Sequence, residues 1–169
     1  EYALLATSEA DPQFRADVLR GLTGIPKAIP ARWLYDQRGS ELFDAITRLR
    51  SYYPTATETA LLQDIVPEVA ERVGPGRAVV EFGAGSLTKT PILLEAIRPT
   101  LYVPVDISGD YLRESAASLA AKLPGLPIHP VEADFVGEMA LPGAVQGHPV
   151  LGFFPGSTIG NFVPWSATD

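Results

Sequence analysis

The strongest constraint on the fold is the alternation of apolar runs and helical patterns between residues 77 and 154. Apolar runs bounded by glycine or proline predict strands at 77–82, 101–108, 126–135 and 148–154. Helical spacing between the first three runs predicts helices at 88–97 and 109–123. Strands joined by helical crossovers run parallel, and a parallel sheet is covered on both faces. We therefore predict an α/β fold for this part of the chain.

The preceding part of the chain has helical spacing without strand patterns. A first helix is expected over residues 11–22, with Asp11 as its cap and Pro12 in its first turn. Pro26 and Pro30 then impose an extended segment, because proline removes a backbone donor and restricts the residue before it.

Two more helices are expected before the first strand. One covers residues 39–49, with Ser40 as its cap. Thr55 and Glu58 have the spacing of a capping box and predict the start of the next helix. Pro67 lies inside that helix and should kink or split it.

Composition limits the classes of function. The 169 residues are 46% apolar, which is enough for a sizeable core. Thirteen basic and twenty acidic residues give a net charge of −7, the wrong sign for neutralising phosphates, so we expect no nucleic-acid partner. The absence of cysteine excludes disulfides and thiolate chemistry, and with only two histidines we expect no metal site.

No apolar stretch approaches the roughly 20 residues of a membrane-spanning helix, and the first residues lack the basic start of a signal peptide. The chain begins at Glu1 and not at Met, which leaves a removed leader open. We expect a cytoplasmic protein with no membrane partner.

The glycine turn after the first strand, "EFGAGSLTKT", is the first candidate for a ligand site, since ligands bind beyond the carboxyl ends of parallel strands. A dinucleotide fingerprint fails because Thr88 stands where the third glycine should be. The same threonine is the one mismatch to the phosphate loop G-x-x-x-x-G-K-[ST], and "LYVPVD" imitates the strand that ends in a magnesium-binding aspartate. Thr88 tolerates the required backbone poorly, and Glu81 adds negative charge.

A nucleoside cofactor without phosphates, such as S-adenosylmethionine, suits the acids at three strand ends better. Glu81 precedes the turn, and Asp106 could accept both ribose hydroxyls. Asp134 offers an acceptor for an adenine amine, and Phe135 offers an aromatic wall. Each acid alone could equally be a helix cap or a solvated loop residue.

Several blocks together resemble a known family: "IPKAIPARWLYDQRGSELFDAITRLRSYYPTATET", "VEFGAGSLTKT", "YVPVDIS", "ADF" and "FFPGSTIGNFVP". From about Ala10 to Pro164 the chain resembles the histidine-specific S-adenosylmethionine-dependent methyltransferases of ergothioneine biosynthesis. The resemblance implies successive transfer of three methyl groups to the α-amine of free L-histidine. It also implies a Rossmann-like class I methyltransferase sheet, of which this chain has the first four strands, preceded by an N-terminal helical segment.

Residue roles follow from the resemblance by motif. The implied cofactor contacts are Gly83, Lys89, Asp106, Asp134 and Phe135. The implied contacts with the amino acid are Tyr52, Gly156 and Asn161, and Tyr35 is expected to orient the reacting amine. Lys89 could pair with the methionine carboxylate of the cofactor.

Members of this family are longer and continue into further strands and a second substrate domain. We therefore expect residues 1–74 to be a helical segment contributing to the substrate pocket, and residues 75–169 to be the first part of the cofactor domain. The edge of the fourth strand should be covered by a partner, a swapped segment or a missing C-terminal half. A phosphate-loop nucleotide-binding protein and a cofactor-binding module without catalysis stay open as alternatives.

Overall fold

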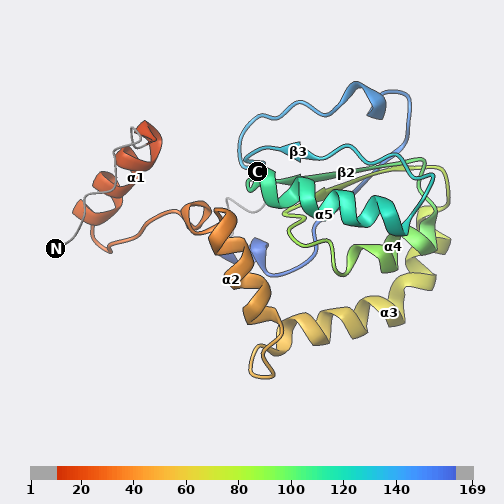
Figure 1. Ribbon diagram of the computed structural model, residues 1–169, viewed down its shortest axis with the longest axis horizontal. Helices are drawn as coiled ribbons and strands as arrows, with labels where there is room; N and C mark the ends of the chain where they lie inside the picture. Colours follow the sequence, from red (N-terminus) through yellow and green to blue (C-terminus); the bar gives the residue numbers. More distant parts are fainter. Residues whose placement is uncertain (1–10, 163–169) are drawn as a thin grey trace. The chain divides into compact units, whose positions relative to one another are not determined.

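The structure is a computed structural model that describes residues 11–162 of the chain. The chain divides into two compact units, Glu1–Tyr35 and Asp36–Asp169. The first contains helix α1 (Pro12–Thr23) and the short 3-10 helix η1 (Ala31–Leu34) (Figure 1). Asp11 caps α1 as predicted, because its Oδ1 accepts the N–H of Gln13 at 2.7 Å.

A buried carboxylate, Asp17, joins α1 to η1 within this first unit. Its Oδ2 accepts hydrogen bonds from the guanidinium of Arg32 at 2.7 Å and the indole N–H of Trp33 at 2.9 Å. Its Oδ1 accepts from Gln13 and Arg20, both on α1. The Trp33 hydrogen bond, followed by that of Arg32, holds the pKa of Asp17 below its usual value. The carboxylate therefore holds η1, which follows the predicted proline-rich segment, against α1.

The second unit is built on a parallel sheet in the order β3-β2-β1-β4. Its strands are β1 (Ala78–Phe82), β2 (Leu101–Asp106), β3 (Val131–Glu132) and β4 (Val150–Phe153). β1 is central: Val80 is opposite Val103 of β2 on one side and Gly152 of β4 on the other. The α/β fold predicted from the alternating pattern is confirmed.

Both faces of the sheet are covered (Figure 1). Helices α4 (Thr90–Ile97) and α5 (Gly109–Lys122) pack on one face through Leu93, Leu112 and their neighbours. The segment around Val145 covers the other face against Val80 and Val103. This is why β1 and β2 are nearly continuous apolar runs, as buried parallel strands require.

Helix α2 (Gln37–Thr47) starts two residues earlier than predicted, and Ser40 is not its cap. Asp36 is the cap instead, since its Oδ1 accepts the N–H of Gly39 at 2.7 Å. Ser40 lies inside the helix, where its own N–H bonds to the carbonyl of Asp36. The aspartate takes the cap because it is the first side chain that can reach the free donors of the opening turn.

Helix α3 (Tyr53–Val73) contradicts the predicted capping box. It begins after Tyr52 with Pro54 in its first turn, so Thr55 is already helical and caps nothing. Pro67 lies inside one continuous helix and does not split it, although the ribbon of α3 bends in its second half (Figure 1). The helix packs along α4, which compensates for the lost backbone hydrogen bond.

Two predicted strands are shorter or less buried than expected. β3 has only two residues, and Ile128 contributes one isolated bridge to Tyr102. Within the described residues, β4 pairs with β1 alone and forms an edge of the sheet. Its side chains alternate between exposed and half-buried, with Val150 45% exposed, so it is not the buried strand that its composition suggests.

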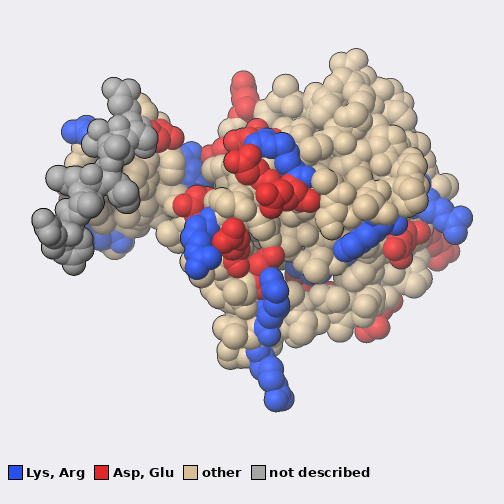
Figure 2. Space-filling view, in the orientation of Figure 1, with Lys and Arg blue, Asp and Glu red and all other residues tan. Residues whose placement is uncertain are grey.

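Charges on the visible face of the second unit are mixed in sign (Figure 2). Neighbouring acids and bases pair along the helices, as in Arg38 with Glu41 and Arg113 with Asp110. Among residues 11–162, no helix combines the length and apolar character needed to cross a bilayer.

Candidate functional site

Four predicted site segments meet at the carboxyl edge of the sheet. They are the glycine turn after β1, Asp106 at the end of β2, Asp134 with Phe135 after β3, and the turn after β4. Parallel strands bring their carboxyl ends to one edge, so the sequence pattern alone predicts this gathering.

The glycine turn lies directly against the turn after β4. Gly83 has a φ of 66°, which favours glycine, and a Cβ there would lie 3.3 Å from Thr158 Oγ1 and 3.7 Å from the Phe154 ring. Gly85 also has a positive φ, 53°, whereas Thr88 does not. The two glycines therefore let the backbone turn sharply and approach the β4 turn closely.

Asp106 ties the glycine turn to the start of α5. One carboxylate oxygen accepts the N–H of Gly85 at 3.0 Å, and the other accepts the N–H of Ser108 at 2.9 Å. A carboxylate has about four lone-pair sites. Each oxygen can therefore accept one further hydrogen bond from a ligand.

The two residues after β3 lie in different environments. Asp134 accepts the N–H of Val136 at 3.1 Å, an arrangement that fixes its own loop. The half-buried Phe135 ring belongs to an aromatic cluster, with its centroid 5.8 Å from Phe82 and 5.4 Å from Phe154. The cluster joins the ends of β1, β3 and β4 on the site side of the sheet.

Tyr52, at the start of α3, reaches the turn after β4. Its hydroxyl lies 3.2 Å from Ser157 Oγ, and its ring meets Phe43 of α2 edge to face. A residue 105 positions away in sequence is thus brought to the predicted amino-acid loop.

Glu58 contacts two of the predicted site segments, although its spacing from Thr55 predicted a helix cap. Its carboxylate accepts from Lys89 Nζ on one oxygen and from the backbone N–H of Gly156 on the other. Gly156 has a φ of 87° and carries no Cβ beside the lysine. The spacing of Thr55 and Glu58 matched a local motif, and no local signal could reveal partners 31 and 98 residues away.

Glu81 faces the core, which corrects the expectation that it adds charge beside the glycine turn. It is 2% exposed and accepts from the Tyr102 hydroxyl at 2.6 Å and the Thr90 hydroxyl at 2.9 Å. Burial raises the pKa of Glu81 to about 7, although both hydroxyl donors and Lys89 lower it. Burial, followed by the charge of Glu81, raises the pKa of Tyr102 well above its ordinary value. The alternation along β1 directs this side chain toward Thr90 at the start of α4 and Tyr102 of β2.

Two further predicted residues lie at the ends of short 3-10 helices. Asn161 is exposed at the end of the 3-10 helix η3 (Thr158–Asn161). Tyr35 belongs to the first unit and ends η1. Their roles stay predictions.

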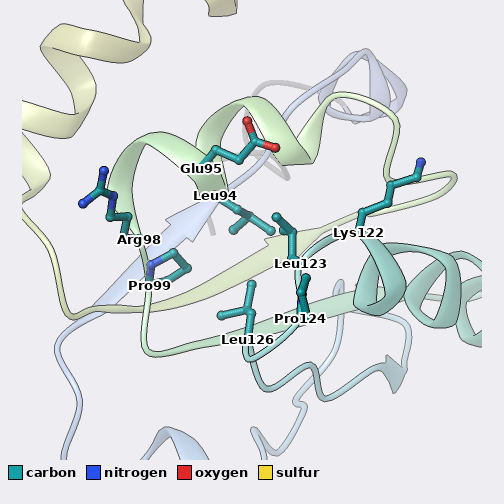
Figure 3. Close-up of a pocket in the computed structure, with 8 residues that line it drawn as sticks. All are labelled: Leu94, Glu95, Arg98, Pro99, Lys122, Leu123, Pro124 and Leu126. Atoms are coloured by element: carbon teal, nitrogen blue, oxygen red, sulfur yellow. The ribbon is translucent and has the colours of Figure 1, made fainter.

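A hollow of about 260 Å³ lies between the C-terminal ends of α4 and α5, apart from the segments described above (Figure 3). It is formed by the ends of α4 and α5, where Leu94, Leu123 and Leu126 make the floor. Arg98 and Lys122 extend away from its centre. None of the predicted site residues lines it.

Comparison with curated proteins finds histidine N-alpha-methyltransferases and other N-methyltransferases. The chain is 40% identical to histidine N-alpha-methyltransferase of Mycolicibacterium smegmatis, over 95% of this chain and 50% of that protein. It is 40% identical to the enzyme of the same name from Mycobacterium tuberculosis, over 89% and 47%. Ergothioneine biosynthesis protein 1 of Neurospora crassa is 34% identical over 56% of this chain and 11% of that protein. The chain thus spans about half the length of the first two.

These matches give no support to the phosphate-loop alternative. The family model described as histidine-specific, S-adenosylmethionine-dependent methyltransferase matches residues 14–169. The chain belongs to this family of histidine-specific, S-adenosylmethionine-dependent methyltransferases.

Proposed function

We propose that this chain supplies the cofactor site and part of the substrate site of an N-methyltransferase that trimethylates the α-amine of L-histidine in ergothioneine biosynthesis. One observation supports the proposal above others: the glycine turn of β1 lies against the turn of β4, which Tyr52 and Glu58 connect to α3. The turn assigned to the cofactor and the turn assigned to the amino acid are therefore neighbours, as direct group transfer requires.

The residues at the sheet edge fit S-adenosylmethionine. Asp106 keeps acceptor capacity for two ribose hydroxyls after bonding Gly85 and Ser108. Gly83 allows the sharp turn of the backbone after β1, and the Lys89 ammonium can pair with the methionine carboxylate. Asp134 and Phe135 are proposed to hold the adenine.

When bound, the cofactor supplies an electrophilic methyl group on its sulfonium. The protein must hold the amine in line with that group and exclude water. We assign this positioning to the Tyr52 hydroxyl, the Gly156 turn and the Asn161 amide, with Tyr35 orienting the amine. Asn161 can donate to a carboxylate or accept from an amine, which suits the head group of an amino acid.

Calorimetric titration with S-adenosylhomocysteine and with magnesium–ATP tests the cofactor assignment. We expect binding of the first and none of the second. Asp106→Asn should raise the dissociation constant for S-adenosylhomocysteine roughly tenfold to a hundredfold, because a hydrogen bond to a charged group is lost with each hydroxyl. Asp110→Asn is the matched control, since Asp110 is exposed and pairs with Arg113. Binding of ATP alone would refute the cofactor assignment.

The substrate assignment needs a separate assay. We expect mass spectrometry to detect methylated histidine, and no other methylated amino acid, after incubation of the full-length protein with S-adenosylmethionine and each amino acid. No methylation of histidine would contradict the proposed specificity and leave the cofactor result intact.

The free edge of β4 supports a further part of the proposal. We propose that another strand, from additional chain or from a second copy, pairs with β4, because an exposed strand edge invites pairing. Light scattering of the purified chain distinguishes a monomer from a dimer.

In the same scheme residues 1–74 contribute to the substrate pocket, residues 75–169 begin the cofactor domain, and the enzyme acts in the cytoplasm.

A further inference from the structure

Glu58 bonds both predicted ligand turns. The residue sits in the second turn of α3. Lys89 belongs to the turn assigned to the cofactor, and Gly156 belongs to the turn assigned to the amino acid. One carboxylate therefore stands where two ligands of the proposed reaction would meet.

The Glu58 carboxylate, the Lys89 ammonium and the Gly156 backbone N–H lie close together. A Cβ on Gly156 would lie 3.7 Å from Lys89 Nζ, so the backbone donor and the ammonium are neighbours. The Glu58 side chain is 32% exposed and that of Lys89 is 21% exposed. Partial burial of the pair strengthens its electrostatic interactions, and the remaining exposure allows a ligand to reach it.

The chemistry of this set matches an amino-acid head group. Both small molecules of the proposed reaction, the methionine part of the cofactor and free histidine, carry an ammonium beside a carboxylate. A ligand carboxylate would meet the Lys89 ammonium, which has two N–H donors left after its bond to Glu58. Glu58 uses only two of its lone-pair sites there, so it can accept an ammonium as well.

We propose that Glu58, held by the Gly156 N–H, binds the α-ammonium of a zwitterionic amino-acid head group whose carboxylate is bound by Lys89 Nζ. The inference rests on the proposed function, because that function supplies the two zwitterions. It adds a ligand-binding role for a residue of α3.

Paired ligands separate this role from a structural one. S-adenosylhomocysteine carries the head group, whereas 5′-methylthioadenosine has the same nucleoside and thioether without it. If the bound head group is that of the cofactor, Glu58→Gln should raise the dissociation constant of S-adenosylhomocysteine roughly tenfold, the loss expected for one charged hydrogen bond, and leave that of 5′-methylthioadenosine unchanged. Lys89→Met should reduce the preference for S-adenosylhomocysteine in the same direction.

Glu68→Gln is the matched control. Glu68 lies on the same helix and also forms an ion pair, with Arg72 at 2.8 Å, but it is exposed. We expect the Glu68→Gln variant to bind S-adenosylhomocysteine and 5′-methylthioadenosine with the same dissociation constants as the unaltered chain. Circular dichroism of all variants verifies that they are folded.

A second arm identifies the source of the head group. The protein saturated with S-adenosylhomocysteine is titrated with L-histidine and with histamine, which lacks the carboxylate. If Glu58→Gln weakens only the binding of histidine, the head group is that of the substrate. If it weakens only S-adenosylhomocysteine, the head group is that of the cofactor.

Three results would overturn the proposal. Equal weakening of S-adenosylhomocysteine and 5′-methylthioadenosine would show a purely structural role. Tighter binding of S-adenosylhomocysteine would show that Glu58 competes with the ligand carboxylate. No change for either zwitterion would show no role in binding. Failure of the unaltered chain to bind S-adenosylhomocysteine would instead refute the cofactor assignment itself, and the Glu58 proposal with it.

Discussion

Two buried carboxylates, one in each unit, are held in opposite ways. Asp17 in the first unit is 4% exposed and receives donors from two arginines and an indole. Glu81 in the second unit is 2% exposed and receives only two hydroxyls. The pKa of Asp17 is lowered, and the pKa of Glu81 is raised to about 7.

The difference shows that burial alone does not decide the charge of an acid. Desolvation acts on both side chains, but the Trp33 indole, followed by the Arg32 guanidinium, favours the ionised form of Asp17 and outweighs it. Neutral hydroxyls stabilise the Glu81 carboxylate less than desolvation destabilises it. The first unit therefore uses an ion to join its segments, and the sheet holds a carboxyl group that is easily neutralised.

Removing the Glu81 side chain should give the largest effect. Glu81→Ala leaves a cavity and two buried hydroxyls without their acceptor, so we expect the free energy of unfolding to fall by about 3 kcal/mol. Denaturant unfolding of the chain measures it. Glu81→Gln, which keeps an acceptor, serves as the control and should cost about 1 kcal/mol. Equal losses in both variants would contradict the importance of the acceptor.

The pH dependence of stability should distinguish the two acids. The pKa of Glu81 rises from 4.5 to about 7 on folding, so the folded protein binds more protons between these values. Its stability should therefore fall as pH rises through this window, by up to about 3 kcal/mol, and stay level above it. Glu81→Gln should flatten this part of the curve.

Asp17 gives the opposite sign in a lower range. Its contribution is present above its usual pKa of 3.8 and is lost as pH falls below that value. It should add no slope where Glu81 titrates. In Glu81→Gln, where the contribution of Glu81 is removed, the free energy of unfolding should not rise between pH values of about 5 and about 7. Such a rise would contradict the assignment of Asp17 to the lower pH range.

Asp17→Asn should have the smallest reach, confined to the first unit. The amide cannot accept all the donors that meet Asp17, so hydrogen exchange in residues 12–34 should accelerate roughly tenfold. Arg20→Gln is the control, because Arg20 is exposed and its pair with Asp17 should matter little. Mass spectrometry localises the exchange, and acceleration spread over the sheet would contradict the confinement.

Much of the fold could be predicted because its signals are local. The apolar runs at β1 and β2, the glycine turn and the Asp11 cap all depend on neighbouring residues. The predictions for Ser40, Thr55 and Glu58 were wrong where several polar residues competed for one helix start. A cap depends on which side chain reaches the free donors first, and spacing alone does not decide that.

The candidate site likewise has some features that local sequence patterns predict and others that depend on contacts between distant segments. The positions of Gly83, Asp106 and Phe135 at strand ends follow from the parallel order, whose periodicity is visible in the sequence. The contact of Tyr52 with Ser157 and the inward direction of Glu81 required packing between distant segments.

The alternation of elements and the parallel sheet follow from patterns of residues near one another in the chain, and the family follows from motifs spread along it. The partners of Glu58 and the environment of Glu81 depend instead on how the folded chain packs. Those partners are brought together by the burial of apolar surface on the helices and the sheet. This burial is non-directional and does not select which polar groups come to lie beside one another. The charge and the role of a carboxylate depend on the groups that the packing places around it.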